Sequence, residues 1–150
     1  MSIKSQIEEL EKYKNTEKVV YIPMVRLISV DFNVNNKKYN LSMNLPNLYP
    51  CSPPQNIYLN HCFRVDYQLQ FYRFLKGNQT IIKKYFETEN LSEASILHPR
   101  NWKTKFKILD IVHEFELFQN MVSCSILFRY FDNKGLLNDD VLRNVASYIK

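Results

Sequence analysis

The stretch LPNLYPCSPPQNIYLN, which runs from Leu45 to Asn60, decides how this chain is expected to fold. Four of the six prolines in the 150-residue sequence lie within the nine positions from Pro46 to Pro54. Because proline cannot donate a hydrogen bond to a β ladder, Pro46 is expected to end one strand, and the prolines after it keep the connection irregular. Bonds that precede proline adopt the cis form far more often than others, so Tyr49-Pro50 is expected to form a sharp turn anchored by the Tyr49 ring.

The residues on both sides of this stretch alternate in the way that half-buried strands do. Before it, the apolar residues Tyr39, Leu41, Met43 and Leu45 alternate with the polar residues Asn40, Ser42 and Asn44. After it, Ile57 and Leu59 continue an alternation into which Phe63 also falls. Alternation of this kind predicts antiparallel strands with one buried face, so the proline stretch is expected to connect two strands of one sheet.

A longer segment rich in β-forming residues precedes the turn signal at Asn35-Asn36. It is VVYIPMVRLISVDFNV, from Val19 to Val34. Val25 and Leu27 share one parity in this segment, whereas Val30, Phe32 and Val34 share the other. The change of parity near Ile28 and Ser29 predicts a bulge or a strand break at that point.

Helical spacing marks the start, the middle and the end of the chain. Ile3, Ile7 and Leu10 predict an amphipathic helix from Ile3 to about Lys14, with Ser2 or Ser5 as its N-cap. Between Val65 and Asn90, two short helices separated by Gly77-Asn78 are expected. Residues 103–131 predict a buried helix, or a helix with a break, that ends at 132–135. Asn138 is expected to cap a final helix whose inward residues are Val141, Leu142, Val145, Tyr148 and Ile149.

This order of elements predicts an α+β fold in a single domain that covers residues 1–150. It has an N-terminal helix, an antiparallel four-stranded meander and an inserted helical middle segment. The C-terminal helices are expected to pack on one face of the sheet, because a run of strands followed by a run of helices favours that layering.

Charge and cysteine content exclude several classes of function. The net charge is +5, but the 20 lysines and arginines are scattered and no nucleic-acid motif accompanies them, so no nucleic-acid partner is expected. The three cysteines, Cys51, Cys62 and Cys124, have no CxxC spacing, which argues against a disulfide framework and a zinc site. A reducing compartment, cytoplasmic or nuclear, is expected. No apolar run approaches the ~20 residues of a membrane span, and the charged N-terminus lacks the apolar core of a signal peptide.

The proline stretch resembles a motif of the ubiquitin-conjugating enzyme fold. In that family a strand ends in LP, is followed by YPxxPP, and leads into an alternating strand; Tyr49, Pro50, Pro53 and Pro54 match each named position. Trp102, placed just before a helix, is similar to the tryptophan before the family's central helix. The resemblance covers most of residues 1–120, with the specific motif confined to residues 45–54. The related RWD domain is the close alternative, because Tyr49, Pro50 and Pro54 also satisfy its YPxxxP.

The resemblance also implies where a catalytic centre would lie, and the required residues are missing there. The family's His-Pro-Asn tripeptide falls on Arg64-Val65-Asp66, and an ionised Asp cannot donate a hydrogen bond to an oxyanion. The catalytic cysteine position falls near Phe74. The interval up to Trp102 is longer than in the family, which indicates an atypical insertion at about 65–97. His98-Pro99 is interpreted as a loop dipeptide.

Other residues offer little for catalysis or cofactor binding. His61 precedes Cys62, but neighbours on a strand point to opposite faces, so Cys62 is expected to be a buried structural thiol. Inert packing is likewise expected for Cys51 and Cys124. The histidines have no metal-ligand spacing, and no phosphate loop, catalytic serine motif or dinucleotide fingerprint occurs. No metal site and no cofactor are therefore expected.

Two hypotheses of different classes follow, with a third as an extension. The first is a catalytically inactive ubiquitin-conjugating-like domain that binds ubiquitin, a conjugation-pathway enzyme or another protein. Its candidate binding residues are Arg26, Asn40, Ser42 and Asn44, which face outward from the meander, where solvating the sheet is the alternative role. The second is an active conjugating enzyme that uses a displaced cysteine, Cys62. In the third, segment 65–97 is a partner-specific surface and the remaining fold is only a scaffold. An RWD-type scaffold domain is a further alternative.

Overall fold

The computed structural model describes residues 2–60, 73, 76–78, 95–135 and 139–147. The elements in chain order are α1 (Ile3–Lys12), β1 (Thr16–Ile22), β2 (Leu27–Val34), β3 (Lys37–Asn44), β4 (Gln55–Leu59), α4 (Ile108–Lys134) and α5 (Asp139–Ser147). Several sequence predictions lie outside the described residues: Phe63 as a strand residue, most of the two helices within 65–90, Asn138 as a cap, and Tyr148 and Ile149 as core residues.

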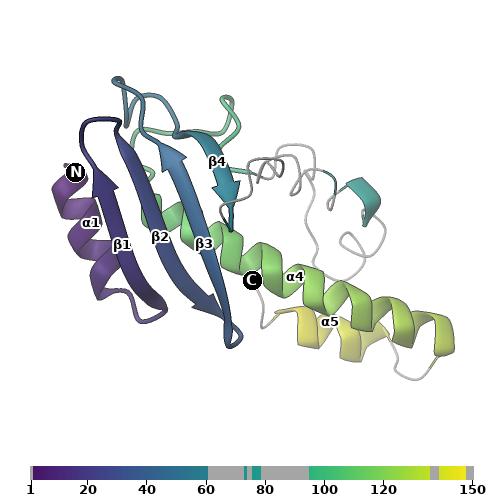
Figure 1. Cartoon of the computed structure of the whole chain (residues 1–150). Coiled ribbons are helices and arrows are strands. Elements are labelled where there is room, and N and C mark those ends of the chain that lie inside the picture. Colours follow the sequence, from purple (N-terminus) through teal and green to yellow (C-terminus); the bar gives the residue numbers. More distant parts are fainter. Residues whose placement is uncertain (1, 61–72, 74–75, 79–94, 136–138, 148–150) are drawn as a thin grey trace.

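The strands form one antiparallel sheet in the order β1-β2-β3-β4. Helix α4 crosses one face of this sheet, α1 lies beside β1 and contacts α4, and α5 packs on the far half of α4 (Figure 1). In the described part of the chain, no helix covers the opposite face (Figure 1). We call the face that packs on α4 the inner face and the opposite one the outer face. The predicted α+β arrangement is thus confirmed.

The core lies between the inner face of the sheet and the first half of α4. Ile28, Val30 and Phe32 alternate along β2 and are fully buried. The ring of Phe32 meets the ring of Phe115 on α4 edge to face, with the ring centroids 5.4 Å apart. Such an aromatic pair contributes about 0.5–1.5 kcal/mol beyond the burial of its area. The alternation of apolar residues therefore fixes which face of the sheet α4 covers.

Caps and turns form where the sequence predicted them. The Ser2 side chain accepts a hydrogen bond from the backbone N–H of Ser5 at 3.1 Å and caps α1. Asn35 and Asn36, between β2 and β3, have φ angles of 52° and 65°, a region that asparagine tolerates better than most residues. Gly135 ends α4 with a φ of 63°.

The break within the segment 19–34 lies earlier than the parity pattern predicted. The register of β2 with both neighbours runs without interruption through Ile28 and Ser29, so the prediction of a bulge or break there is wrong. The turn occupies residues 23–26, where the N–H of Arg26 donates to the carbonyl oxygen of Pro23 at 3.2 Å. Pro23 has no N–H for the ladder, which ends β1 at this point. Val25 belongs to the turn and not to a strand, so its place in the alternating pattern does not indicate which face is buried.

The C-terminal helices bury fewer residues than predicted. Helix α4 is continuous over 27 residues, and its second half extends beyond the sheet, where Ile126 and Leu127 are 67% and 53% exposed (Figure 1). The prediction of a buried helix is wrong for one side of this half, because no strand of the described residues lies over it; Ser125 and Phe128, also in this half, are buried. In α5 the buried residues are Leu142 and Ala146, whereas Val141 and Val145 are exposed, so their predicted inward position is wrong. Among the described residues, no helix combines the length and apolarity needed to cross a membrane.

Candidate functional site

The outer face of the sheet is the candidate binding surface, and the strand register sets its composition. One row of paired residues crosses all four strands: Val20, Ser29, Ser42 and Tyr58. The neighbouring row runs from Ile22 on β1 through Leu27 and Asn44 to Gln55 on β4. Val20 and Ile22 therefore form an apolar edge on β1 that Leu27 extends onto β2, and the other residues of these rows, Ser29, Ser42, Asn44, Gln55 and Tyr58, carry polar groups.

The apolar border of this surface consists of Val20 and Ile22, which sequence reasoning missed. Their exposed fractions are 39% and 44%. A signal for them was present, because all four residues of the run from Val19 to Ile22 are apolar. Only one parity of such a run faces the core in a sheet with a single covered face, so the other parity must be exposed to solvent.

Asn40 lies on the outer face as predicted, but it connects strands and is not an open contact residue. Its exposed fraction is 6%. Its Nδ2 donates to Ser29 Oγ at 2.7 Å and to Asp31 Oδ1 at 2.6 Å, both on β2. Its backbone N–H donates to Asn60 Oδ1 at 2.9 Å, and the Asn60 N–H donates back to the Asn40 carbonyl oxygen at 2.8 Å. Asn40 is therefore removed from the candidate contact residues for a partner, because its N–H groups donate hydrogen bonds that stabilise the sheet.

Arg26 is also occupied by contacts within the fold. Its Nε donates to the carbonyl oxygen of Leu45 at 2.8 Å, and its Nη2 donates to that of Pro46 at 3.1 Å. On the same end of the sheet, the Nδ2 of Asn44 donates to the carbonyl oxygen of Val25 at 3.3 Å. These contacts fasten the β1–β2 turn to the start of the proline stretch. Ser42, half-buried in the middle of the outer face, keeps the position that the sequence predicted.

The proline stretch forms a junction with Trp102 and with Gln6 on α1. The Tyr49-Pro50 bond is cis, and the Tyr49 side chain is buried, as predicted. The Tyr49 and Trp102 rings lie 6.2 Å apart, and the Trp102 Nε1 donates to the Pro50 carbonyl oxygen at 2.8 Å. Pro54 is buried and Pro53 is half-buried. Tyr49, Pro50 and Trp102, which carry part of the resemblance, are therefore joined by structural contacts.

Gln6 on α1 completes this junction, and sequence reasoning did not predict it. Its side chain is 2% exposed, although glutamine is rarely buried. Its Oε1 accepts hydrogen bonds from the Tyr49 hydroxyl and, at 3.2 Å, from the backbone N–H of Ile108. It therefore satisfies a donor at the first turn of α4, where N–H groups lack partners within the helix. Burial raises the pKa of Tyr49 to about 12.

The cysteines in the described residues differ in exposure. Cys124 on α4 is half-buried, and burial raises the pKa of its thiol, which disfavours the reactive thiolate. Cys51 in the proline stretch is exposed, so the prediction of inert packing is wrong for it. Cys62 and its neighbour His61 lie outside the described residues. The same holds for Arg64-Val65-Asp66 and Phe74, the positions that the resemblance assigns to catalysis.

The segment that contains His98-Pro99 holds Trp102 in place. The carbonyl oxygen of His98 accepts hydrogen bonds from the N–H groups of Asn101 and Trp102, at 2.8 and 3.0 Å. On α4, Glu114 accepts from the Ser95 hydroxyl at 2.9 Å and from the Ile96 N–H at 2.7 Å. This arrangement agrees with the interpretation of His98-Pro99 as a loop dipeptide.

Metal ligands and known relatives give no further identification. Across the described part of the chain, no group of three or more His, Cys, Asp or Glu side chains is placed to hold a metal ion. Comparison with known protein families, curated proteins and solved structures finds no match to this chain. The resemblance to the ubiquitin-conjugating enzyme fold therefore rests on residues 45–54 and Trp102.

Proposed function

We propose that this chain is a non-catalytic protein-interaction domain, similar to inactive ubiquitin-conjugating enzyme variants, and that it binds ubiquitin or a conjugation-pathway protein. It works in a reducing compartment, cytoplasmic or nuclear. The observation that supports the proposal is the outer face of the sheet. An exposed apolar border, Val20 and Ile22, lies beside half-buried polar side chains, Ser42 and Asn44, with no described helix over them.

The composition of this surface suits a weak and reversible partner. Interfaces of transient complexes are about as apolar as the rest of a protein surface and often bury less than about 1,200 Å². Burying what remains exposed of Val20 and Ile22 would contribute about 1 kcal/mol or less for each side chain, because more than half of each is already covered. The polar neighbours then supply orientation through hydrogen bonds. Binding in the micromolar range is expected.

A titration of isotope-labelled ubiquitin with the unlabelled chain tests this proposal by NMR. Chemical-shift changes are expected on ubiquitin at sub-millimolar concentrations, and Val20→Lys on the outer face weakens the binding roughly tenfold. Leu127→Lys is the matched control, because it makes the same kind of change at an exposed site on α4. Absence of shifts at about 1 mM removes ubiquitin as the partner. Equal weakening by both variants contradicts the assignment of the outer face.

A separate assay tests the non-catalytic part of the proposal. The chain is incubated with activating enzyme, ATP and ubiquitin, and then separated on a gel with and without reductant. No adduct is expected, because the resemblance places no cysteine at the catalytic position. A reductant-sensitive adduct that disappears in Cys62→Ala would establish the alternative, a conjugating enzyme with a displaced cysteine.

A further inference from the structure

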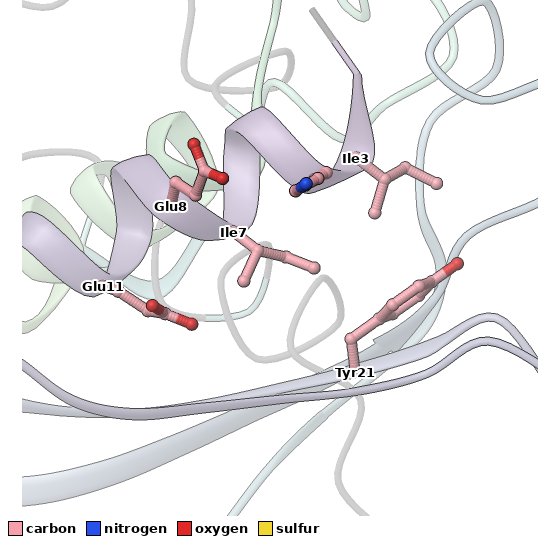
Figure 2. Close-up of a pocket in the computed structure, with 6 residues that line it drawn as sticks. Ile3, Ile7, Glu8, Glu11 and Tyr21 are labelled. Carbon is pink, nitrogen blue, oxygen red and sulfur yellow. The ribbon is translucent and has the colours of Figure 1, made fainter.

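A groove lies between α1 and β1, at the β1 end of the sheet. It is lined by Ile3, Lys4, Ile7, Glu8, Glu11 and Tyr21 and has a volume of about 450 Å³. Figure 2 shows Ile7 and Tyr21 pointing into the gap between helix and strand, with Glu11 toward one end and Ile3 toward the other. This volume falls in the range of roughly 300–1,000 Å³ that is typical of binding pockets.

The groove forms because two neighbouring rows of side chains on α1 are buried to different extents. Gln6 and Leu10 face the core and are buried. Ile3 and Ile7, one turn apart on the neighbouring stripe, are only half-buried, because β1 is the last strand on this side of the sheet. Two apolar side chains of the helix thus remain partly open to solvent beside the ring of Tyr21.

The backbone of β1 borders this groove as a sheet edge. In the described part of the chain, β1 pairs with β2 and has no strand on its other side. An edge strand presents a row of N–H and C=O groups that another strand can pair with. Apolar side chains flank this edge on both faces, Tyr21 on the inner face and Val20 and Ile22 on the outer face. A strand added here would find apolar contacts for both sets of its alternating side chains.

The charges of the groove are opposite in sign to those of the whole chain. Glu8 and Glu11 are exposed and line the groove together with a single cation, Lys4. Glu9, the third acidic residue of α1, is directed elsewhere, because its Oε1 lies 2.9 Å from the Lys107 Nζ near the start of α4. The groove is therefore locally acidic in a chain with a net charge of +5.

We propose that an extended peptide segment of a partner protein adds to the β1 edge as a fifth strand. Two side chains of this peptide face the groove. One is apolar and packs on Ile7 and Tyr21; the other, two positions away, is a lysine or arginine and lies beside Glu8 and Glu11. The spacing fits, because two strand residues span about 6.7 Å and one helical turn of four residues spans about 6 Å. This site shares Val20 and Ile22 with the border of the outer face, but the groove beside α1 and the backbone edge of β1 lie outside that face, so the inference does not rest on the function proposed above.

Fluorescence anisotropy with labelled peptides of about ten residues, enough for one strand, tests this proposal. The probes carry valine at every second position and leucine and lysine between the valines, in both orders to cover the two strand directions. Binding by at least one lysine probe is expected. A probe with glutamate in place of lysine, and one with a central proline, should bind at least fivefold more weakly, because they lose the charge complementarity or the ladder.

Variants of α1 test whether the groove causes the preference for the lysine probe over the glutamate probe. Glu8→Gln with Glu11→Gln should weaken the lysine probe roughly five- to tenfold, as expected for two partly exposed ion pairs. Glu9→Gln is the matched control and should stay within about twofold, because Glu9 faces α4. The double variant Glu8→Lys with Glu11→Lys should reverse the preference toward the glutamate probe.

Three results of the binding assays overturn the proposal. They are no binding of any lysine probe at about 1 mM, equal affinity for the lysine and glutamate probes, and equal losses in the Glu9→Gln control and the double Gln variant. Circular dichroism of each variant shows that it is folded before binding is measured. Hydrogen exchange completes the test, because amides of β1 should gain protection in the peptide complex. Protection elsewhere without any at β1 also overturns it.

Discussion

The indole Nε1 of Trp102 donates a hydrogen bond to the carbonyl oxygen of Pro50 at 2.8 Å, across 52 residues of sequence. This hydrogen bond joins the loop between β3 and β4 to the segment that leads into α4. The Tyr49 ring packs on the same indole, and the Tyr49 hydroxyl reaches Gln6 on α1. Three separate segments therefore converge on the motif that carries the family resemblance, and the motif stabilises the fold whether or not the chain has any catalytic role.

Trp102→Phe is expected to destabilise the fold. It keeps an aromatic ring but removes the only side-chain donor to Pro50 among the described contacts, which costs about 1–3 kcal/mol in the free energy of unfolding. Urea denaturation followed by circular dichroism measures this change. Tyr130→Phe on the exposed part of α4 is the control and should change the free energy by less than about 0.5 kcal/mol. A smaller effect for Trp102→Phe than for the control would contradict this account of the junction.

Asn40→Asp is expected to destabilise the sheet in a pH-dependent way. The substitution removes both Nδ2 donors and places a carboxylate beside Asp31, whose Oδ1 now lies 2.6 Å from the Asn40 amide nitrogen. At pH 7 the expected loss is about 2–4 kcal/mol, because two like charges replace a hydrogen bond. Below about pH 4 part of the loss should be regained, because protonation of one carboxyl group removes the repulsion. Asn44→Asp, on the same face, should show little of this pH dependence.

The buried Tyr49 and the half-buried Tyr13 should make the fold sensitive to alkali. Burial raises the pKa of Tyr13 and Tyr49 from 10.0 to about 12, and for Tyr13 the hydrogen bond to Glu116 adds to the shift. Because both values are raised in the folded state, their contribution to stability is fully present below pH 10 and is lost as the pH rises through about 12. Urea denaturation at several pH values measures this slope. The double variant Tyr13→Phe with Tyr49→Phe should be less stable at pH 7 but show a shallower loss above pH 10; an unchanged slope would refute the assignment.

The two glycines of the chain should respond oppositely to alanine. Gly135 caps α4 with a φ of 63°, so Gly135→Ala should cost about 1 kcal/mol through backbone strain, although the added Cβ would meet no atom within 4 Å. Gly77 is helical and also has open space around its Cβ position, so Gly77→Ala should be neutral or stabilise by up to about 1 kcal/mol. Thermal unfolding of the two variants under identical conditions compares them. Destabilisation by Gly77→Ala of the same size would contradict this distinction.

Local features were readable from the sequence alone. Alternation predicted β3 and its buried face, the Asn35-Asn36 pair predicted the turn before it, and Gly135 marked the end of α4. These features depend on neighbouring residues, whose preferences are set by sterics and by burial of one parity. The start of α1 at Ile3 and its cap at Ser2 were predictable for the same reason.

The candidate surfaces required the tertiary structure. The sequence pattern placed Asn40 and Arg26 facing outward. In the structure, however, the Asn40 amide donates to Ser29 and Asp31, and the Arg26 guanidinium donates to carbonyl groups at the start of the proline stretch. Long-range hydrogen bonds of this kind depend on which strand ends meet, and sequence spacing does not record that.

The sequence by itself determined the α+β class, the meander and the helical ends of this protein, because periodicity and turn residues act locally. Only the tertiary structure decided that Gln6 is buried, that Val20 and Ile22 border an open face, and that Glu8 and Glu11 line a groove beside a sheet edge while Glu9 pairs with Lys107. Residues with the same helical pattern have different roles because the elements packed around α1 leave one of its stripes covered and the next one open.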